Sequence, residues 1–91
     1  MIETGNVPRV RLSPKMRLQW EQSQGAHVLL YPEGMIQLNE SAAVILELCD
    51  GSRTADQVVG ELAQRFDAPG LEDDISEFLE TARSHGWVVD A

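Results

Sequence analysis

The chain has 91 residues and a mass of 10.1 kDa, which suits one domain, because each half of a divided chain would approach the roughly 40–60 residues where an unaided core is marginal. Fifteen acidic against seven basic residues give a net charge of −8, which makes nucleic acid and anionic lipid poor candidate partners. No apolar run approaches the roughly 20 residues of a membrane span, no signal peptide opens the chain, and the single Cys49 excludes an intramolecular disulfide. We expect a soluble, cytoplasmic protein.

The charges are unevenly placed along the chain. Residues 1–39 hold three acids and four bases, whereas residues 40–91 hold twelve acids and three bases. The ordinary explanation is that acidic helices present a solvated face. The alternative is that the basic N-terminal part meets an acidic helix, either in its own chain or in a symmetric partner.

Residues 1–15 form an extended N-terminal arm in our prediction, and residues 16–91 form the single domain. Pro8, Pro14 and weak periodicity favour an arm that is mobile unless something ties it down, although residues 10–12 could add a strand. Residues 17–21, 26–31 and 35–38 have strand-like composition and are separated by turn signals. They predict a three-stranded antiparallel meander with the second strand in the middle.

Three helices are predicted after the meander. Asn39 is placed to cap the first, which Gly51 ends; Thr54 and Gln57 fit a capping box at the start of the second, which Pro69 and Gly70 end. The third runs from Leu71 to a stop at Gly86, and residues 87–89 form an apolar tail able to fold back on the core. The fold class is therefore α+β, a meander followed by three helices, with winged helix-turn-helix character.

Few residues offer catalytic or metal-binding chemistry. His27 and His85 lack the spacing that sets two ligands on one helix face, and they are best explained as a strand residue and a cation near a helix C-terminus. Cys49 lies on the apolar stripe of the first helix, as a small buried hydrophobe would. The acids at 72–74 suit a helix N-terminus. We predict a protein that is not an enzyme and has no cofactor or metal.

The third strand is the candidate binding element, because residues 35–38 carry no charge and no proline, and an open strand edge pairs readily with an extended peptide. If the third helix packs beside it, the two would form a trough; the alternative is that the helix residues face only the core. The candidate peptide-binding residues are Met35, Ile36, Gln37, Leu38, Ile75, Leu79 and Ala82.

The segments 29–34, 38–42 and 45–51, followed by Arg53 and Thr54, closely resemble the PqqD family of pyrroloquinoline quinone (PQQ) biosynthesis, and the likeness covers roughly residues 7–90. The resemblance implies a winged helix-turn-helix recognition element for a ribosomally made, post-translationally modified peptide (RiPP). Such a protein binds the leader of the precursor PqqA, as an added strand between the third strand and the third helix. It presents the precursor to PqqE, a radical S-adenosylmethionine (SAM) enzyme.

Two other functions stay open from the residues alone. A DNA-binding winged helix would need basic residues on its recognition helix, whereas the second and third helices offer only Arg65 and Arg83. A purely structural homodimer would have the N-terminal arm, with Arg9 and Arg11, cross to a neighbouring chain.

Overall fold

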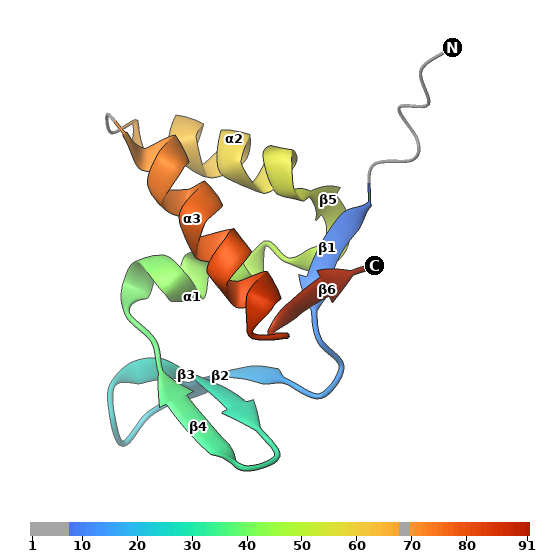
Figure 1. Cartoon of the computed structure of the whole chain (residues 1–91). Coiled ribbons are helices and arrows are strands. Elements are labelled where there is room, and N and C mark those ends of the chain that lie inside the picture. The colour runs from blue at the N-terminus through green and yellow to red at the C-terminus, as the bar shows by residue number, and fades with distance from the viewer. Residues whose placement is uncertain (1–7, 68–69) are drawn as a thin grey trace.

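The computed structural model describes residues 8–67 and 70–91, and in this part of the chain three helices accompany two three-stranded antiparallel sheets (Figure 1). The α+β class predicted from the sequence is confirmed. None of the helices in the described ranges is long and apolar enough to cross a membrane. In chain order, the elements are β1 (Arg9–Leu12), β2 (Arg17–Glu21), β3 (Ala26–Tyr31), β4 (Gly34–Gln37), α1 (Glu40–Glu47), β5 (Asp50–Thr54), α2 (Ala55–Phe66), α3 (Leu71–Ser84) and β6 (Val88–Asp90).

The meander sheet consists of β2, β3 and β4, which pair in chain order with β3 in the middle. Leu18, Leu29 and Ile36 lie opposite one another across the three strands. They face the core, where Leu29 is fully buried. Because side chains alternate between the two faces of a strand, Val28 points to the other face of the sheet. Strand β4 corresponds to the strand predicted at residues 35–38, but it starts and ends one residue earlier.

The second sheet has the order β5-β1-β6 and joins three distant parts of the chain. In its middle strand, Val10 is 1% exposed. The strand considered for residues 10–12 is thus present at 9–12, as the centre of a sheet that the sequence did not predict. Of the arm expected at 1–15, residues 1–7 lie outside the described residues.

The caps read from the sequence locate the helix starts. The Asn39 side chain accepts a hydrogen bond from the Ala42 N–H at 2.8 Å, and Thr54 and Gln57 form the reciprocal capping box. Helix α2 ends earlier than predicted, with Asp67 in the left-handed region at φ 49°. The predicted stop at Gly70 is instead the residue preceding α3, and Pro69 lies outside the described residues.

The end of α1 corrects two expectations. The helix stops at Glu47, so Cys49 lies beyond it and not on its apolar stripe. Gly51 does have a positive φ of 90°, but it lies within β5 and is not the helix stop. The register of β5 against β1 shifts beside this residue, which is the local irregularity of a β-bulge. Pairing with a distant strand therefore decides the conformation here.

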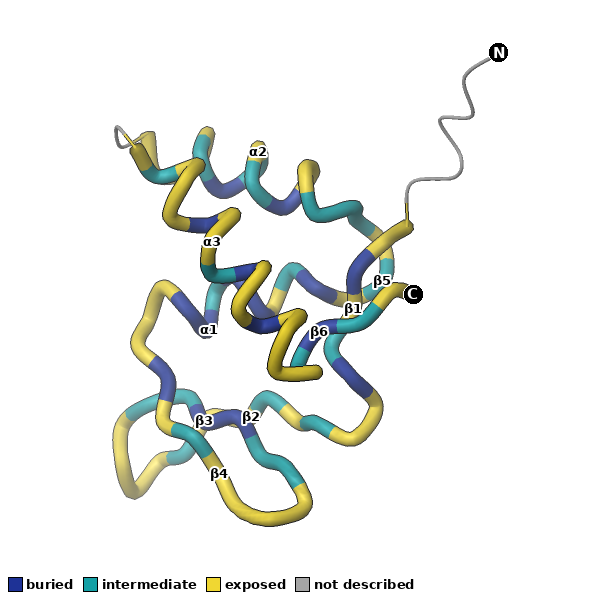
Figure 2. Tube along the Cα trace, viewed as in Figure 1, coloured by how far each residue is buried: buried dark blue, intermediate teal, exposed yellow. Residues whose placement is uncertain are grey.

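One core joins the helices to both sheets (Figure 2). Leu46 of α1, Leu62 of α2 and Ala82 of α3 are at most 2% exposed, and Leu29 and Val88 contribute from the two sheets. The tail at 87–89 does fold back on this core, as strand β6 with Val88 buried. The core thus fixes the meander relative to α3.

Candidate functional site

Strand β4 is the edge of the molecule best suited to pairing with another chain. The outer strands of the two described sheets are β2, β4, β5 and β6, and charged residues occur in β2, β5 and β6 but not in β4. Charge on an edge strand discourages pairing with a further strand, and β4 lacks that protection. We call the outward side of Gly34–Gln37 the β4 edge.

The register shows which backbone groups this edge offers. The Leu38 N–H donates to the His27 oxygen at 2.9 Å, so Leu38 and His27 form a hydrogen-bonded pair. Because hydrogen-bonded and non-hydrogen-bonded pairs alternate along an antiparallel ladder, the pair Gln37 and Val28 is non-hydrogen-bonded, as is Met35 with Leu30. The N–H and C=O groups of Met35 and Gln37 therefore point away from β3, toward the open edge.

The predicted site residues differ widely in exposure. Met35 is 47% exposed, Gln37 is exposed, Ile36 is half-buried and Leu38 is 7% exposed. On α3, Ile75, Leu79 and Ala82 are 3%, 6% and 0% exposed and pack in the core. The structure therefore gives these three helix residues the core-facing role that the sequence left as the alternative.

A hollow of about 630 Å³ lies at the C-terminal end of α3 and connects it to the meander. Tyr31 and Ile36 line it from the meander, while His85 and Trp87 line it from the other side. The rings of His85 and Trp87 stack with centroids 5.0 Å apart. The described residues that line it are Ser13, Lys15, Met16, Tyr31, Pro32, Glu33, Ile36, His85, Gly86 and Trp87.

A more apolar hollow of about 310 Å³ lies between the three helices. Phe66, 53% exposed at the end of α2, forms part of its wall. Its lining is Ser41, Val44 and Ile45 of α1, Leu62 and Phe66 of α2, and Leu71, Asp74, Ile75 and Phe78 of α3. We call it the three-helix hollow.

One side of α3 faces both hollows. Asp74 and Phe78 line the three-helix hollow and His85, directly after the helix, lines the other, at spacings of four and seven that keep residues on one helical face. The sequence did not point to this side, because the acids at 72–74 were assigned to the helix terminus and Phe78 was not among the candidate residues. The same spacing, read for half-buried and polar residues, could have found it.

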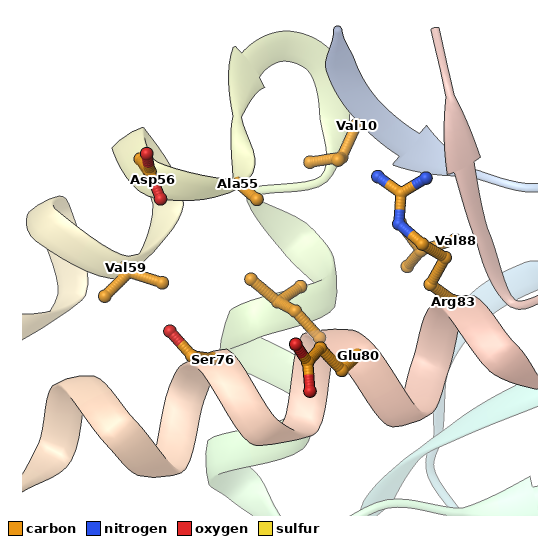
Figure 3. A pocket seen from close by; sticks show the side chains of 9 residues that line it. Val10, Ala55, Asp56, Val59, Ser76, Glu80, Arg83 and Val88 are labelled. Carbon is orange, nitrogen blue, oxygen red and sulfur yellow. The ribbon is translucent and has the colours of Figure 1, made fainter. Parts of the chain in front are cut away.

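A third hollow of about 180 Å³ lies on the opposite side of α3, toward α2 and the second sheet (Figure 3). Figure 3 shows Asp56, Ser76, Glu80 and Arg83 around its mouth. Arg83 is paired with Asp90 through a 2.6 Å contact between Nη1 and Oδ1. This hollow is separated from the β4 edge by the body of α3.

His27 and Cys49, which the sequence offered as titratable candidates, pack against other side chains or lie buried. The His27 Nε2 lies 3.7 Å from Glu47, and its ring meets Trp20 edge to face at 5.1 Å. Burial raises the pKa of the Cys49 thiol to about 11, with a smaller contribution from Asp50, so it is not a ready nucleophile. No group of three His, Cys, Asp or Glu side chains that could hold a metal ion occurs within residues 8–67 and 70–91.

An uncharged strand edge next to the hollow that Ile36 lines suits pairing with an extended peptide. The family model for "Coenzyme PQQ synthesis protein D (PqqD)" matches residues 26–88. The chain belongs to the PqqD family.

Curated relatives and solved structures agree with this family. A "PqqA binding protein" of Methylococcus capsulatus is 52% identical over 87% of this chain and 85% of its own length, and one of Azotobacter vinelandii is 48% identical over 91% and 89%. The solution structure of the PqqD truncation of Methylobacterium extorquens PqqCD matches with a TM-score of 0.69 and 32% identity, over 88% of this chain and 87% of that one. That structure is described as a functional and stand-alone RiPP recognition element. The crystal structure of PqqD from Xanthomonas campestris matches at a TM-score of 0.51 and 30% identity, over 93% and 94%.

Proposed function

We propose that this protein is a non-catalytic adaptor of PQQ biosynthesis that binds the precursor peptide PqqA as an added strand. The observation that carries the proposal is the uncharged, open β4 edge in a chain of the PqqD family. The names of the curated relatives, which are PqqA binding proteins, support the identity of the guest.

The guest pairs with residues 35–38 and lies against the side of α3 that faces the two hollows. Met35 and Gln37 supply the outward backbone groups, and Leu38 anchors the strand in the core. Ile75, Leu79 and Ala82 lie beneath the guest as buried support, while Phe78 is the half-buried α3 side chain placed to touch it. Ordering a flexible guest reduces the net affinity that these contacts provide.

The bound precursor is presented to the radical SAM enzyme PqqE, in which the chemistry takes place. The description of the solved relative as a truncation of PqqCD supports a PqqD domain that acts together with another protein. The meander and the pair α2 and α3 support a winged helix-turn-helix assignment. A homodimer through the N-terminal part would need a further contact surface, and β1 is already engaged on both sides within the described residues.

The decisive test removes one outward N–H from the β4 edge. Gln37→Pro deletes a donor that β3 does not use, and proline is tolerated on an edge strand, so the fold should survive. We expect the variant to lose at least tenfold in affinity for labelled PqqA, while Gln37→Ala binds nearly as the parent does. Amide signals of β4 and α3 should shift when PqqA is added to the labelled parent protein.

The proposal fails if PqqA leaves those amide signals unchanged, or if Gln37→Pro and Gln37→Ala bind PqqA equally. A fluorescence anisotropy titration measures the affinities, and thermal unfolding of each variant confirms that the fold is kept. A second titration with PqqE added tests presentation, for which a complex of all three components is the expected result.

A further inference from the structure

The three-helix hollow is an unfilled apolar space beside the proposed peptide path. Val44, Leu71 and Phe78 are only half-buried around it, and Phe66 is 53% exposed. Large apolar side chains left partly in water at a concave surface gain free energy when another apolar group covers them. The volume of about 310 Å³ leaves room for a large side chain.

The position of the hollow relative to the β4 edge makes it reachable by the same guest. Ser41, on its rim, lies in the first turn of α1, four residues after the end of β4 at Gln37. On the other wall, Phe78 belongs to the side of α3 that also faces the hollow lined by Ile36. A peptide paired with β4 and continuing past Gln37 therefore runs toward this hollow.

The charges around the hollow favour one kind of guest. Among the described residues that line the hollow, Asp74 is the single charged one, and it is exposed at the rim. Helix α1 carries no basic residue, and α3 carries none before Arg83 in its last turn. Arg65 of α2 is paired with Glu61 at 3.4 Å. A cation entering here meets carboxylates and no competing positive group on these two helices.

We propose that the three-helix hollow is an anchor subsite for one large apolar side chain of the precursor, and that Asp74 selects a Lys or Arg next to that side chain. The proposal rests on the adaptor function and specifies the chemistry that the guest must carry. The apolar side chain supplies most of the affinity, because it removes both its own surface and the exposed lining from water. Asp74 supplies mainly selectivity, because an ion pair at an exposed rim is weak and screened by salt.

Two matched pairs of variants test the two parts of the subsite. Val44→Phe fills the hollow from α1, and Val59→Phe places the same change on α2 in the smaller hollow on the far side of α3. Asp74→Asn removes the rim charge, and Asp73→Asn removes the adjacent first-turn charge, which does not line the hollow. Both Asn variants lose a similar favourable interaction with the helix dipole, so their difference reports the hollow alone.

The measurement is the dissociation constant of labelled full-length PqqA at low salt and at high salt. We expect Val44→Phe to raise it about tenfold or more and Val59→Phe to change it less than twofold. Asp74→Asn should raise it about threefold at low salt, with the difference disappearing at high salt, while Asp73→Asn stays within twofold. The Asn changes are at the surface and keep the fold, so they decide the question even if a Phe variant unfolds.

Equal affinities within both pairs would overturn the anchor subsite. If the parent protein binds PqqA, Gln37→Pro does not, and Val44→Phe and Asp74→Asn bind PqqA with the affinity of the parent, the adaptor function stands and the subsite is wrong. If PqqA does not bind the parent at all, both proposals fail. Replacing each Lys and Arg of PqqA in turn by Gln completes the test. One of these replacements should weaken binding to the parent protein but leave binding to the Asp74→Asn variant unchanged.

Discussion

The two sheets of this small protein are built in opposite ways. In the meander, β2, β3 and β4 are neighbours in both sequence and space, joined by short turns. In the second sheet, β1 lies between β5 and β6, which come from the middle and the end of the chain. The meander keeps an uncharged free edge, whereas the second sheet holds residues 9–12 and 88–90 against the helices.

If β4 binds the precursor as proposed, this division separates binding from stability. The meander can lend β4 to a guest because its own pairing requires only one side of that strand. The second sheet has its central strand paired on both sides, and Val10 and Val88 in it are buried against the helices. Changes in the second sheet should therefore affect folding, and changes at the β4 edge should affect binding.

The largest expected effect contrasts the central strand of the second sheet with the edge strand of the meander. Val10→Asp places a carboxylate with no partner in the core and should cost about 3–5 kcal/mol of unfolding free energy. Met35→Asp on the β4 edge should cost clearly less, because Met35 is 47% exposed and a carboxylate there stays in water. Urea denaturation measures both, and equal losses would contradict the contrast.

A smaller effect is expected from the helix caps that follow each sheet. Asn39 caps α1 after the meander, and Thr54 caps α2 after β5. Asn39→Ala and Thr54→Ala should each lower the unfolding free energy by about 1 kcal/mol, because each leaves a first-turn N–H without its acceptor. Thermal unfolding compares them with Ser84→Ala, which should stay near the parent; no loss for Thr54→Ala would exclude the capping box as a source of stability.

A still smaller effect concerns the ion pair between β5 and α2. The Arg53 Nε donates to Glu61 Oε1 at 2.8 Å, and both side chains are partly exposed. Glu61→Gln removes this pair together with the Arg65 contact, and it should lower the unfolding free energy only slightly and less at high salt, since exposed pairs are weak and screened. Glu77→Gln, on the solvent side of α3, is the matched control, and an equal change in both variants would show that the pair contributes nothing.

The smallest expected effect is a titration in β5. Hydrogen bonds from the Ser52 side chain and backbone lower the pKa of Asp50 from its usual 3.8. Because the pKa of Asp50 is lower in the folded state than in the unfolded state, the ionised carboxylate contributes to stability above pH 3.8. This contribution is lost as the pH falls through the folded pKa. Ser52→Ala should move the Asp50 pKa back toward 3.8 in a carboxyl NMR titration, and an unchanged value would contradict this cause.

Some features of the fold are encoded by residues close together in the chain. Asn39 and the capping box at Thr54 are local signals, because a side chain three residues from its partner needs no other part of the chain. The helix stop predicted at Gly51 was wrong, because the conformation of this residue depends on a strand far away in the chain. Its positive φ suits a helix stop as well as a bulge, and pairing between β5 and β1 selected the bulge.

The candidate site shows the same limit. The uncharged run at residues 35–38 indicated an open strand edge, and the structure has an edge strand there, at Gly34–Gln37. The side of α3 that faces the hollows was missed, because the strongest apolar stripe, with Ile75, Leu79 and Ala82, belongs to the core. Helical spacing identifies which residues share a face, but only the packed neighbours show which face is covered.

The sequence by itself determined the three described helices, the caps at Asn39 and Thr54, the meander and the family, since each depends on residues close together or on a motif in fixed order. The tertiary structure alone decided that β1 forms the centre of a second sheet and that α3 presents Asp74 and Phe78 to a hollow. The physical reason is that strand pairing and burial depend on segments far apart in the chain, which local patterns do not encode.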